Sequence, residues 1–137
     1  MEMLECVTFL LVRDGEFLAE KRKLSKALDP GLVAIPGGHM EPGESVEDAL
    51  RREMREELEL TPRRTQFICS LLYRSEELRR LHYFAVTEWA GEMANNEAEA
   101  LLWLPIDAVG RLDLEVDRVA MAEYRRVYEP EIRPPTP

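Results

Sequence analysis

Apolar residues follow two different periods along this chain. Short apolar runs, in part β-branched, predict β-strands at residues 6–12, 32–35, 66–73, 81–89 and 101–104. Residues 16–23 alternate polar and apolar positions after an Asp14-Gly15 turn signal, so we expect them to pair back on the first strand. Two segments instead repeat apolar residues every three or four positions, which predicts helices over residues 45–58 and 116–128.

The order of these elements limits the choice of fold. Strands outnumber helices and the order is mixed, which favours an α+β fold or a three-layer α/β/α sandwich with a mixed β-sheet between helices. At 137 residues the chain is long enough for one domain with its own core. We therefore expect a single domain over residues 1–129. Residues 130–137, which contain Pro134 and Pro135, predict a disordered tail.

Three acidic residues lie close together on the first predicted helix. Glu53, Glu56 and Glu57 stand at positions i, i+3 and i+4, so their side chains share one face. Their mutual repulsion could be offset by a divalent cation such as Mg²⁺, which takes oxygen ligands and usually shares them with substrate phosphates. A solvated acidic face would show the same spacing, so spacing alone leaves both interpretations open.

The segment that leads into this helix is predicted to be a glycine-rich turn, which favours a ligand site. Gly37 and Gly38 allow backbone conformations closed to other residues, and they let a substrate approach the main chain. Ser45 is placed to cap the helix. Arg52 lies four residues before Glu56, so it could pair with that acid and orient it.

Together these residues form a known pattern. In fixed register the chain carries Gly38, Glu44, Arg52-Glu53, Glu56-Glu57 and Leu60. This pattern closely resembles the Nudix box, the signature of hydrolases that act on nucleoside diphosphates linked to another group. One position departs from it, because the family usually has glycine where this chain has Glu59. That glycine ends the helix in a left-handed turn, so a glutamate there should cost roughly 1 kcal/mol or lengthen the helix.

The resemblance implies an α/β sandwich with the box helix on one side of the sheet, and it suggests a metal site. We expect Glu56 and Glu57 to bind the metal, and the resemblance implies that the main-chain carbonyl of Gly37 is a further ligand. Glu53 would be either a third ligand or the base that takes a proton from the attacking water. A bound divalent metal neutralises phosphate charge and lowers the pKa of its water.

Two more residues of the pattern would support this site. Arg52 would orient the acids, and Glu44 would stabilise the turn and contribute to a second metal shell.

Five further positions are candidates outside the box. Some relatives in the MutT branch carry a remote acid where this chain has Glu97, with Glu99 as the competing choice; either could instead lie in a solvated loop. Asp117 is near the place where MutT-like relatives carry a base-reading Asn or Asp, although it could equally start a helix. Arg22 and Lys23, in a basic cluster, could contact phosphates or the base, or could simply end a strand.

Composition excludes some partners. The formal net charge of −9 argues against a nucleic-acid polymer, whose binding depends on Lys and Arg contacts to phosphate. The longest apolar run, near residues 6–12, is too short to span a bilayer. Glu2 and Glu5 stand where a signal peptide would be basic, so we expect a cytoplasmic protein without a membrane partner. The two cysteines predict buried reduced thiols.

Three functions remain open. The first is Mg²⁺-dependent hydrolysis of a nucleoside triphosphate to monophosphate and pyrophosphate, with Mn²⁺ as a substitute. The second keeps the chemistry but acts on ADP-ribose, another nucleoside diphosphate sugar or a dinucleoside polyphosphate. The third is a Nudix-fold module that binds nucleotide without cleaving it, which the complete set of box acids disfavours. The short chain favours the compact MutT-like group. The base, and whether the protein is a monomer or a homodimer, stay open.

Overall fold

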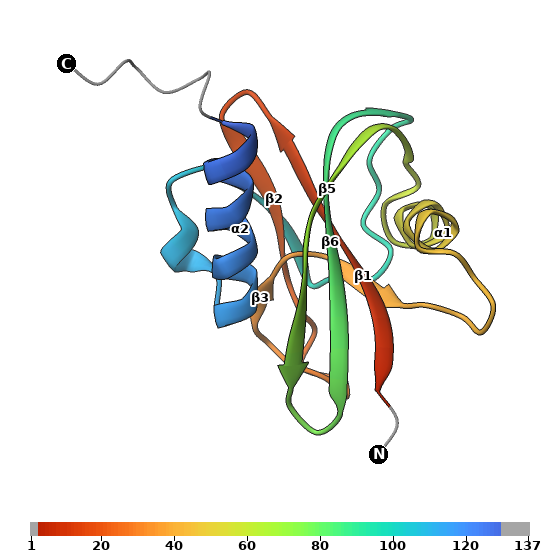
Figure 1. The fold of residues 1–137 in the computed structure, drawn as a ribbon. Helices are drawn as coiled ribbons and strands as arrows, with labels where there is room; N and C mark the ends of the chain where they lie inside the picture. Colours follow the sequence, from red (N-terminus) through yellow and green to blue (C-terminus); the bar gives the residue numbers. More distant parts are fainter. Residues whose placement is uncertain (1–2, 130–137) are drawn as a thin grey trace.

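A mixed β-sheet with one helix on each face forms the protein (Figure 1). The structure is a computed structural model and describes residues 3–129. In chain order the elements are β1 (Leu4–Arg13), β2 (Glu16–Lys21), β3 (Val33–Ala34), β4 (Gly37–His39), α1 (Val46–Leu58), β5 (Thr61–Arg74), β6 (Leu78–Ala90), β7 (Ala100–Pro105), the 3₁₀-helix η1 (Val109–Arg111) and α2 (Glu115–Tyr128). This arrangement confirms the predicted α/β sandwich with a mixed sheet.

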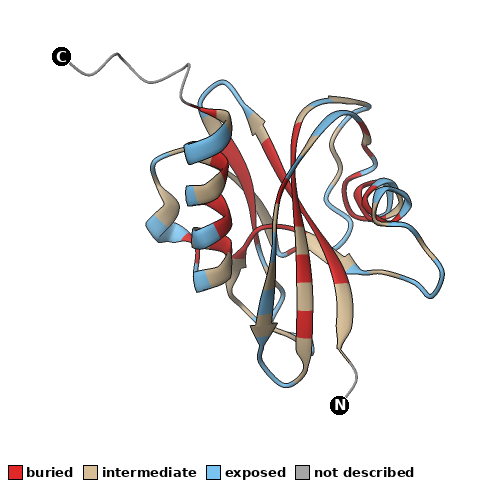
Figure 2. Cartoon of the chain, viewed as in Figure 1, coloured by how far each residue is buried: buried red, intermediate tan, exposed pale blue. Residues whose placement is uncertain are grey.

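The central strands hold the sheet together. The strand order is β3-β2-β1-β6-β5, while β4 pairs with β1 and β7 pairs with β2. Strand β1 runs parallel to β6 from the Leu4–Arg79 pair to the Leu11–Val86 pair, and its other pairings are antiparallel. Residues 6–11 are all buried because both faces of this central strand are covered (Figure 2). A strand covered on both sides reads as a continuous apolar run, which is the pattern seen in the sequence.

Two hydrophobic cores lie on opposite faces of the sheet. On one face Leu50, Met54 and Leu58 of α1 pack with sheet residues, and on the other face Met121 and Tyr124 of α2 do the same. Both helices therefore lie where their periodicity and the family resemblance predicted.

Two sequence-based expectations need correction. The glycine-rich segment was expected to be a turn, but Gly37–His39 forms β4, paired with residues 6–8 of β1. Strands β5 and β6 are also longer than predicted, because β5 starts directly after α1. As an edge strand, β5 tolerates Pro62 and buries few residues, with partly buried and exposed positions alternating over residues 69–74, so its apolar signal is weak. The predicted tail lies outside the described residues.

The ends of α1 show how the unusual box residue is accommodated. The Ser45 hydroxyl accepts a hydrogen bond from the Asp48 amide at 3.1 Å, which confirms the predicted cap. At the other end Glu59 adopts the left-handed conformation, with φ 58° and ψ 33°, and its amide donates to the Arg55 carbonyl at 3.0 Å. The helix thus ends where a glycine would end it. The glutamate is held in the left-handed conformation, which is unfavourable for a residue with a side chain.

Replacing Glu59 with glycine should therefore stabilise the protein. We expect the free energy of unfolding to rise by about 0.5–1 kcal/mol, because glycine adopts the left-handed region without strain, although it gains entropy in the unfolded chain. Urea unfolding of Glu59→Gly, with Glu59→Ala as the control for side-chain loss, measures the effect. Equal stabilities of the two variants would contradict this account of the helix end.

Candidate active site

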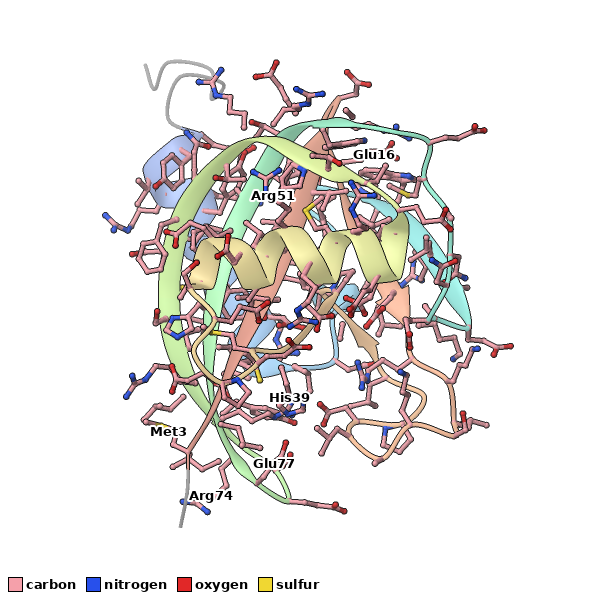
Figure 3. All side chains as sticks on the ribbon, turned by 90° about the vertical axis from the view of Figure 1, so that its right-hand side faces the viewer. Met3, Glu16, His39, Arg51, Arg74 and Glu77 are labelled. Atoms are coloured by element: carbon pink, nitrogen blue, oxygen red, sulfur yellow. The ribbon has the colours of Figure 1, made fainter. Side chains whose placement is uncertain are left out.

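A cavity of about 590 Å³ lies beside α1. It is lined by parts of β4, by the loop at residues 22–32, by the loop at residues 91–99 and by one face of the helix. Figure 3 looks onto α1, with the cavity-lining His39 on one side of the helix and Arg51 on the other. Acidic side chains dominate the wall: Glu20, Asp29, Glu41, Glu53, Glu56, Glu57, Glu97 and Asp117.

Arg52 joins the segment before the helix to the acids on it. Its guanidinium donates two hydrogen bonds to the Glu44 carboxylate, at 2.7 and 2.9 Å. It also donates to Glu53 at 3.0 Å, to Glu56 at 3.1 Å and to the carbonyl of His39 at 3.0 Å. These bonds from Arg52, with a further one from a backbone amide, lower the pKa of Glu44 to about 2. The geometry expected for an orienting arginine is therefore present.

A lysine cannot reproduce this set of contacts. Arg52→Lys should lower kcat about 10–100-fold, because a lysine lacks the planar fork that holds several carboxylates at once. Arg51→Lys is the matched control, since Arg51 is exposed on the same helix and does not line the cavity. Steady-state kinetics of the two variants test the role, and equal rates in both would remove Arg52 from the site.

Gly38 lets the carboxylate of Glu53 lie directly against the main chain. A Cβ atom at Gly38 would lie 2.4 Å from the carboxylate carbon of Glu53, so the close packing requires glycine. Glu53 is buried, and that burial raises its pKa despite the hydrogen bond from Arg52. Gly37 also lines the cavity. The box glycines thus place backbone and acid side by side.

Glu57 is the acid with the least compensation. It is 9% exposed, and its Oε2 atom is buried without a hydrogen-bond partner. Burial raises the pKa of Glu57 to about 9, with further contributions from the nearby carboxylates of Glu20, Glu53 and Glu97. An unpaired carboxylate oxygen facing other acids is a position that a cation would stabilise.

The residues present therefore fit a divalent cation, although they do not form a finished site. Among residues 3–129, no three His, Cys, Asp or Glu side chains are arranged to hold a metal ion together. Arg52 instead holds Glu53 and Glu56 in ion pairs of 3.0 and 3.1 Å. Rotation of those carboxylates toward Glu57 would bring oxygen ligands of the type that Mg²⁺ prefers to one place.

The raised pKa of Glu57 gives a prediction for the metal-free protein. Between its unfolded pKa near 4.3 and its folded pKa of about 9, the folded chain keeps a proton that the unfolded chain releases. Stability should therefore fall as pH rises through this window, by roughly 4 kcal/mol between about pH 5.5 and about pH 8.5, since each pH unit costs about 1.4 kcal/mol. Urea unfolding in EDTA at the two pH values measures the fall. Glu57→Gln should show a smaller fall, and an unchanged one would contradict the assignment.

Sequence reasoning missed Glu20. This residue of β2 is 4% exposed, pairs with Arg22 at 3.2 Å, and lies close enough to raise the pKa of Glu57. Because side chains alternate along a strand, Glu20 shares its face with Leu18, which belongs to the α1 core. The signal available in the sequence was an acid on the α1-facing side of a buried strand.

The loop after β6 brings Glu97 to the acids. Asn96 donates from its backbone to the carbonyl of Glu57 at 3.1 Å and from its side chain to that of Glu56 at 3.0 Å. The loop thus binds free carbonyls at the C-terminal end of α1. Glu97 lines the cavity and accepts a hydrogen bond from Lys26 at 2.9 Å, while Glu99 does not line it.

The other predicted contacts divide into two groups. Asp117 and Arg22 line the cavity, whereas Lys23 is exposed and does not. Asp117 is 2% exposed, and its carboxylate accepts hydrogen bonds from the Ile35 amide and the Tyr83 hydroxyl. Burial raises the pKa of Asp117 to about 6.

The sequence did not predict that a second group of residues would line the cavity. Arg79 pairs with Asp29 at 3.0 Å, and Tyr73 donates to the same carboxylate at 2.9 Å. The Nε atom of Arg79 is buried without a partner. Residues 74–80 lie between the strands predicted at residues 66–73 and 81–89, but Arg79 lies inside β6 and lines the cavity.

The fold and the site define a class, and comparison with known proteins names it. The chain matches the NUDIX domain over residues 4–125, and it belongs to that family. It is therefore a Nudix hydrolase, a nucleotide pyrophosphohydrolase by class. Members of the family generally use divalent metal ions.

Individual relatives agree with this assignment. The CTP pyrophosphohydrolase of Escherichia coli (strain K12) is 34% identical over 104 residues, which are 75% of this chain and 76% of that protein. The nucleoside triphosphatase NudI of the same strain is 51% identical over 49 residues, covering 36% of this chain and 35% of NudI.

Solved structures show the same fold. The E. coli ORF135 protein has a TM-score of 0.79 at 28% identity and covers 95% of each chain. The MutT NUDIX hydrolase of Burkholderia pseudomallei has a TM-score of 0.78 at 27% identity, covering 90% of this chain and 98% of that one. The predicted MutT-like Nudix identity is confirmed. Across residues 3–129, none of the helices is long and apolar enough to cross a membrane.

Proposed function

We propose that this protein hydrolyses a nucleoside triphosphate to the monophosphate and pyrophosphate, using Mg²⁺, with Mn²⁺ as a substitute. The observation that carries the proposal is the unpartnered, buried oxygen of Glu57 among other acids on the wall of an open cavity. A cation would stabilise such an oxygen, and a cation bound there could also bind the phosphates of a substrate in the cavity. Relatives named as a CTP pyrophosphohydrolase and a nucleoside triphosphatase support the choice of substrate.

The proposed division of roles follows the contacts. Glu53, Glu56 and Glu57, with the carbonyl of Gly37 and the remote Glu97, would hold the cation. Bound there, it would neutralise phosphate charge and lower the pKa of a water molecule. Glu53 acts as a further ligand or as the base, and burial raises its pKa, the direction that makes a carboxylate a stronger base.

The supporting residues position these groups. Arg52 and Glu44 keep the acids oriented, and Gly38 leaves room for the Glu53 carboxylate against the main chain. Asp117 would read the base, because its carboxylate can accept a hydrogen bond from an exocyclic amine, and Arg22 would face the phosphates or the base. Lys23 stays a weaker candidate on this geometry. The expectations of a cytoplasmic enzyme and of a monomer or homodimer rest on the sequence alone.

A substrate panel tests the proposal. Purified protein with Mg²⁺ is incubated with CTP, dCTP, the other nucleoside triphosphates, oxidised triphosphates, ADP-ribose and dinucleoside polyphosphates, and products are separated by anion exchange. We expect a cytidine nucleotide to be cleaved to monophosphate and pyrophosphate. Cleavage of ADP-ribose or dinucleoside polyphosphates alone would establish the second function instead. Absence of any cleavage would favour a binding module.

A further inference from the structure

One cation on the cavity wall differs from the rest. The basic residues that line the cavity are Arg22, Lys26, Arg52 and Arg79. Arg52 is held by five acceptor contacts, and the other two arginines each have two different partners. Among residues 3–129, the ammonium group of Lys26 has one partner, the carboxylate of Glu97 at 2.9 Å. Lys26 is thus the cavity cation whose charged group is held by the fewest partners.

The Lys26–Glu97 pair is easily separated. The two side chains are 34% and 47% exposed, and exposed ion pairs contribute little net stability. Both ends of the pair lie next to backbone hydrogen bonds. Glu97 follows the asparagine that binds α1, and the amide of Lys26 donates to the Lys23 carbonyl at 3.1 Å. The partners can therefore change by side-chain rotation while the loops stay in place.

The surroundings give each partner an alternative. Glu97 and Lys26 line the same cavity as Glu57. A cation among the acids would therefore attract Glu97, and the phosphates that accompany it would attract Lys26. Lysine binds phosphate as a mobile point charge on a long stem.

We propose that Lys26 is a phosphate-binding residue whose ammonium group is held by Glu97 in the free enzyme and passes to the substrate's phosphates on binding. This inference deepens the proposed function and rests on it for the identity of the substrate. This exchange of partners links two events. When Glu97 turns to a cation among the acids, it releases Lys26, which can then bind the phosphates.

Inorganic tripolyphosphate tests the exchange without any metal or hydrolysis. Its dissociation constant is measured by NMR titration in EDTA for the wild type, Lys26→Gln, Glu97→Gln and the double variant, with Lys21→Gln as the matched control. Lys21 is exposed at the end of β2 and does not line the cavity. Lys26→Gln should weaken binding about fivefold, because it removes the ammonium group that binds phosphate. Glu97→Gln should tighten binding about threefold, because it frees that ammonium group from its partner.

The double variant decides between exchange and simple charge. If Glu97 acts by holding Lys26, the gain from Glu97→Gln disappears when Lys26 is also glutamine. An equal gain in both backgrounds overturns the proposal, as does a Lys26→Gln affinity equal to that of Lys21→Gln, or no binding by Glu97→Gln.

A kinetic arm uses the metal-loaded enzyme. Lys26→Gln should raise KM more than it lowers kcat, and Lys26→Arg should restore most of the affinity; an unchanged KM overturns the proposal. The tripolyphosphate results do not depend on which nucleotide is cleaved. A wrong substrate assignment and a wrong role for Lys26 therefore give different results.

Discussion

Replacing Glu57 with glutamine should lower kcat/KM about 10³-fold, the largest loss we expect from a single side chain of this site. Glutamine keeps the shape of the side chain and removes its charge. Glu57 is the acid whose Oε2 atom is buried without a partner, so its charge has no compensation from the protein itself. If that charge serves to hold a cation, losing it removes the neutralisation of the phosphates and the activation of water together.

Stability provides the second half of this test. At neutral pH the folded metal-free wild type keeps on Glu57 a proton that the unfolded chain releases, which costs stability, so the metal-free Glu57→Gln protein should be at least as stable as the wild type. Adding Mg²⁺ should raise the melting temperature of the wild type and leave that of the variant nearly unchanged, because only the first binds the ion. Glu47→Gln, an exposed acid on the same helix, is the matched control.

A particular result would contradict this account. Full activity in Glu57→Gln, or an equal response of both proteins to Mg²⁺, would mean that the buried acid has no part in holding a cation. Reduced activity together with a lower melting temperature would instead indicate a structural role.

The local part of the site could be predicted because helical geometry fixes it. Residues three and four positions apart must share a face, so the spacing of Glu53, Glu56 and Glu57 placed them together before any fold was known. The same holds for Arg52, because it lies one helical turn before Glu56, with which it forms an ion pair. Short-range geometry of this kind needs no knowledge of how distant segments pack.

The remainder of the site depends on distant segments that the sequence does not align. Glu20 and Arg79 reach the cavity through strands whose neighbours are set by sheet order, and that order is not readable from one strand's residues. The choice between Glu97 and Glu99 was likewise open, and the contacts of Asn96 with the end of α1 now place Glu97 on the cavity wall. Their roles stay predictions for mutation to test.

The remaining large effect concerns a residue with no side chain. Gly38→Ala should lower kcat/KM about 100-fold, because the new methyl group would occupy the place of the Glu53 carboxylate, 2.4 Å from its carbon atom. The atom displaced is the end of a flexible side chain, so the fold should survive while the acid moves away from its neighbours. Steady-state kinetics and thermal melting, measured on the same preparation, separate these two consequences.

Gly110→Ala is the matched control, since a Cβ atom there meets nothing within 4 Å. It carries the same change in composition and in unfolded-chain entropy, and its activity should equal that of the wild type. If Gly38→Ala also keeps full activity, the position of the Glu53 carboxylate against β4 is not required for turnover. If it loses activity only by unfolding, glycine serves the fold at this position. The expected result, a folded protein with a slow reaction, requires that the close approach of backbone and acid itself supports catalysis.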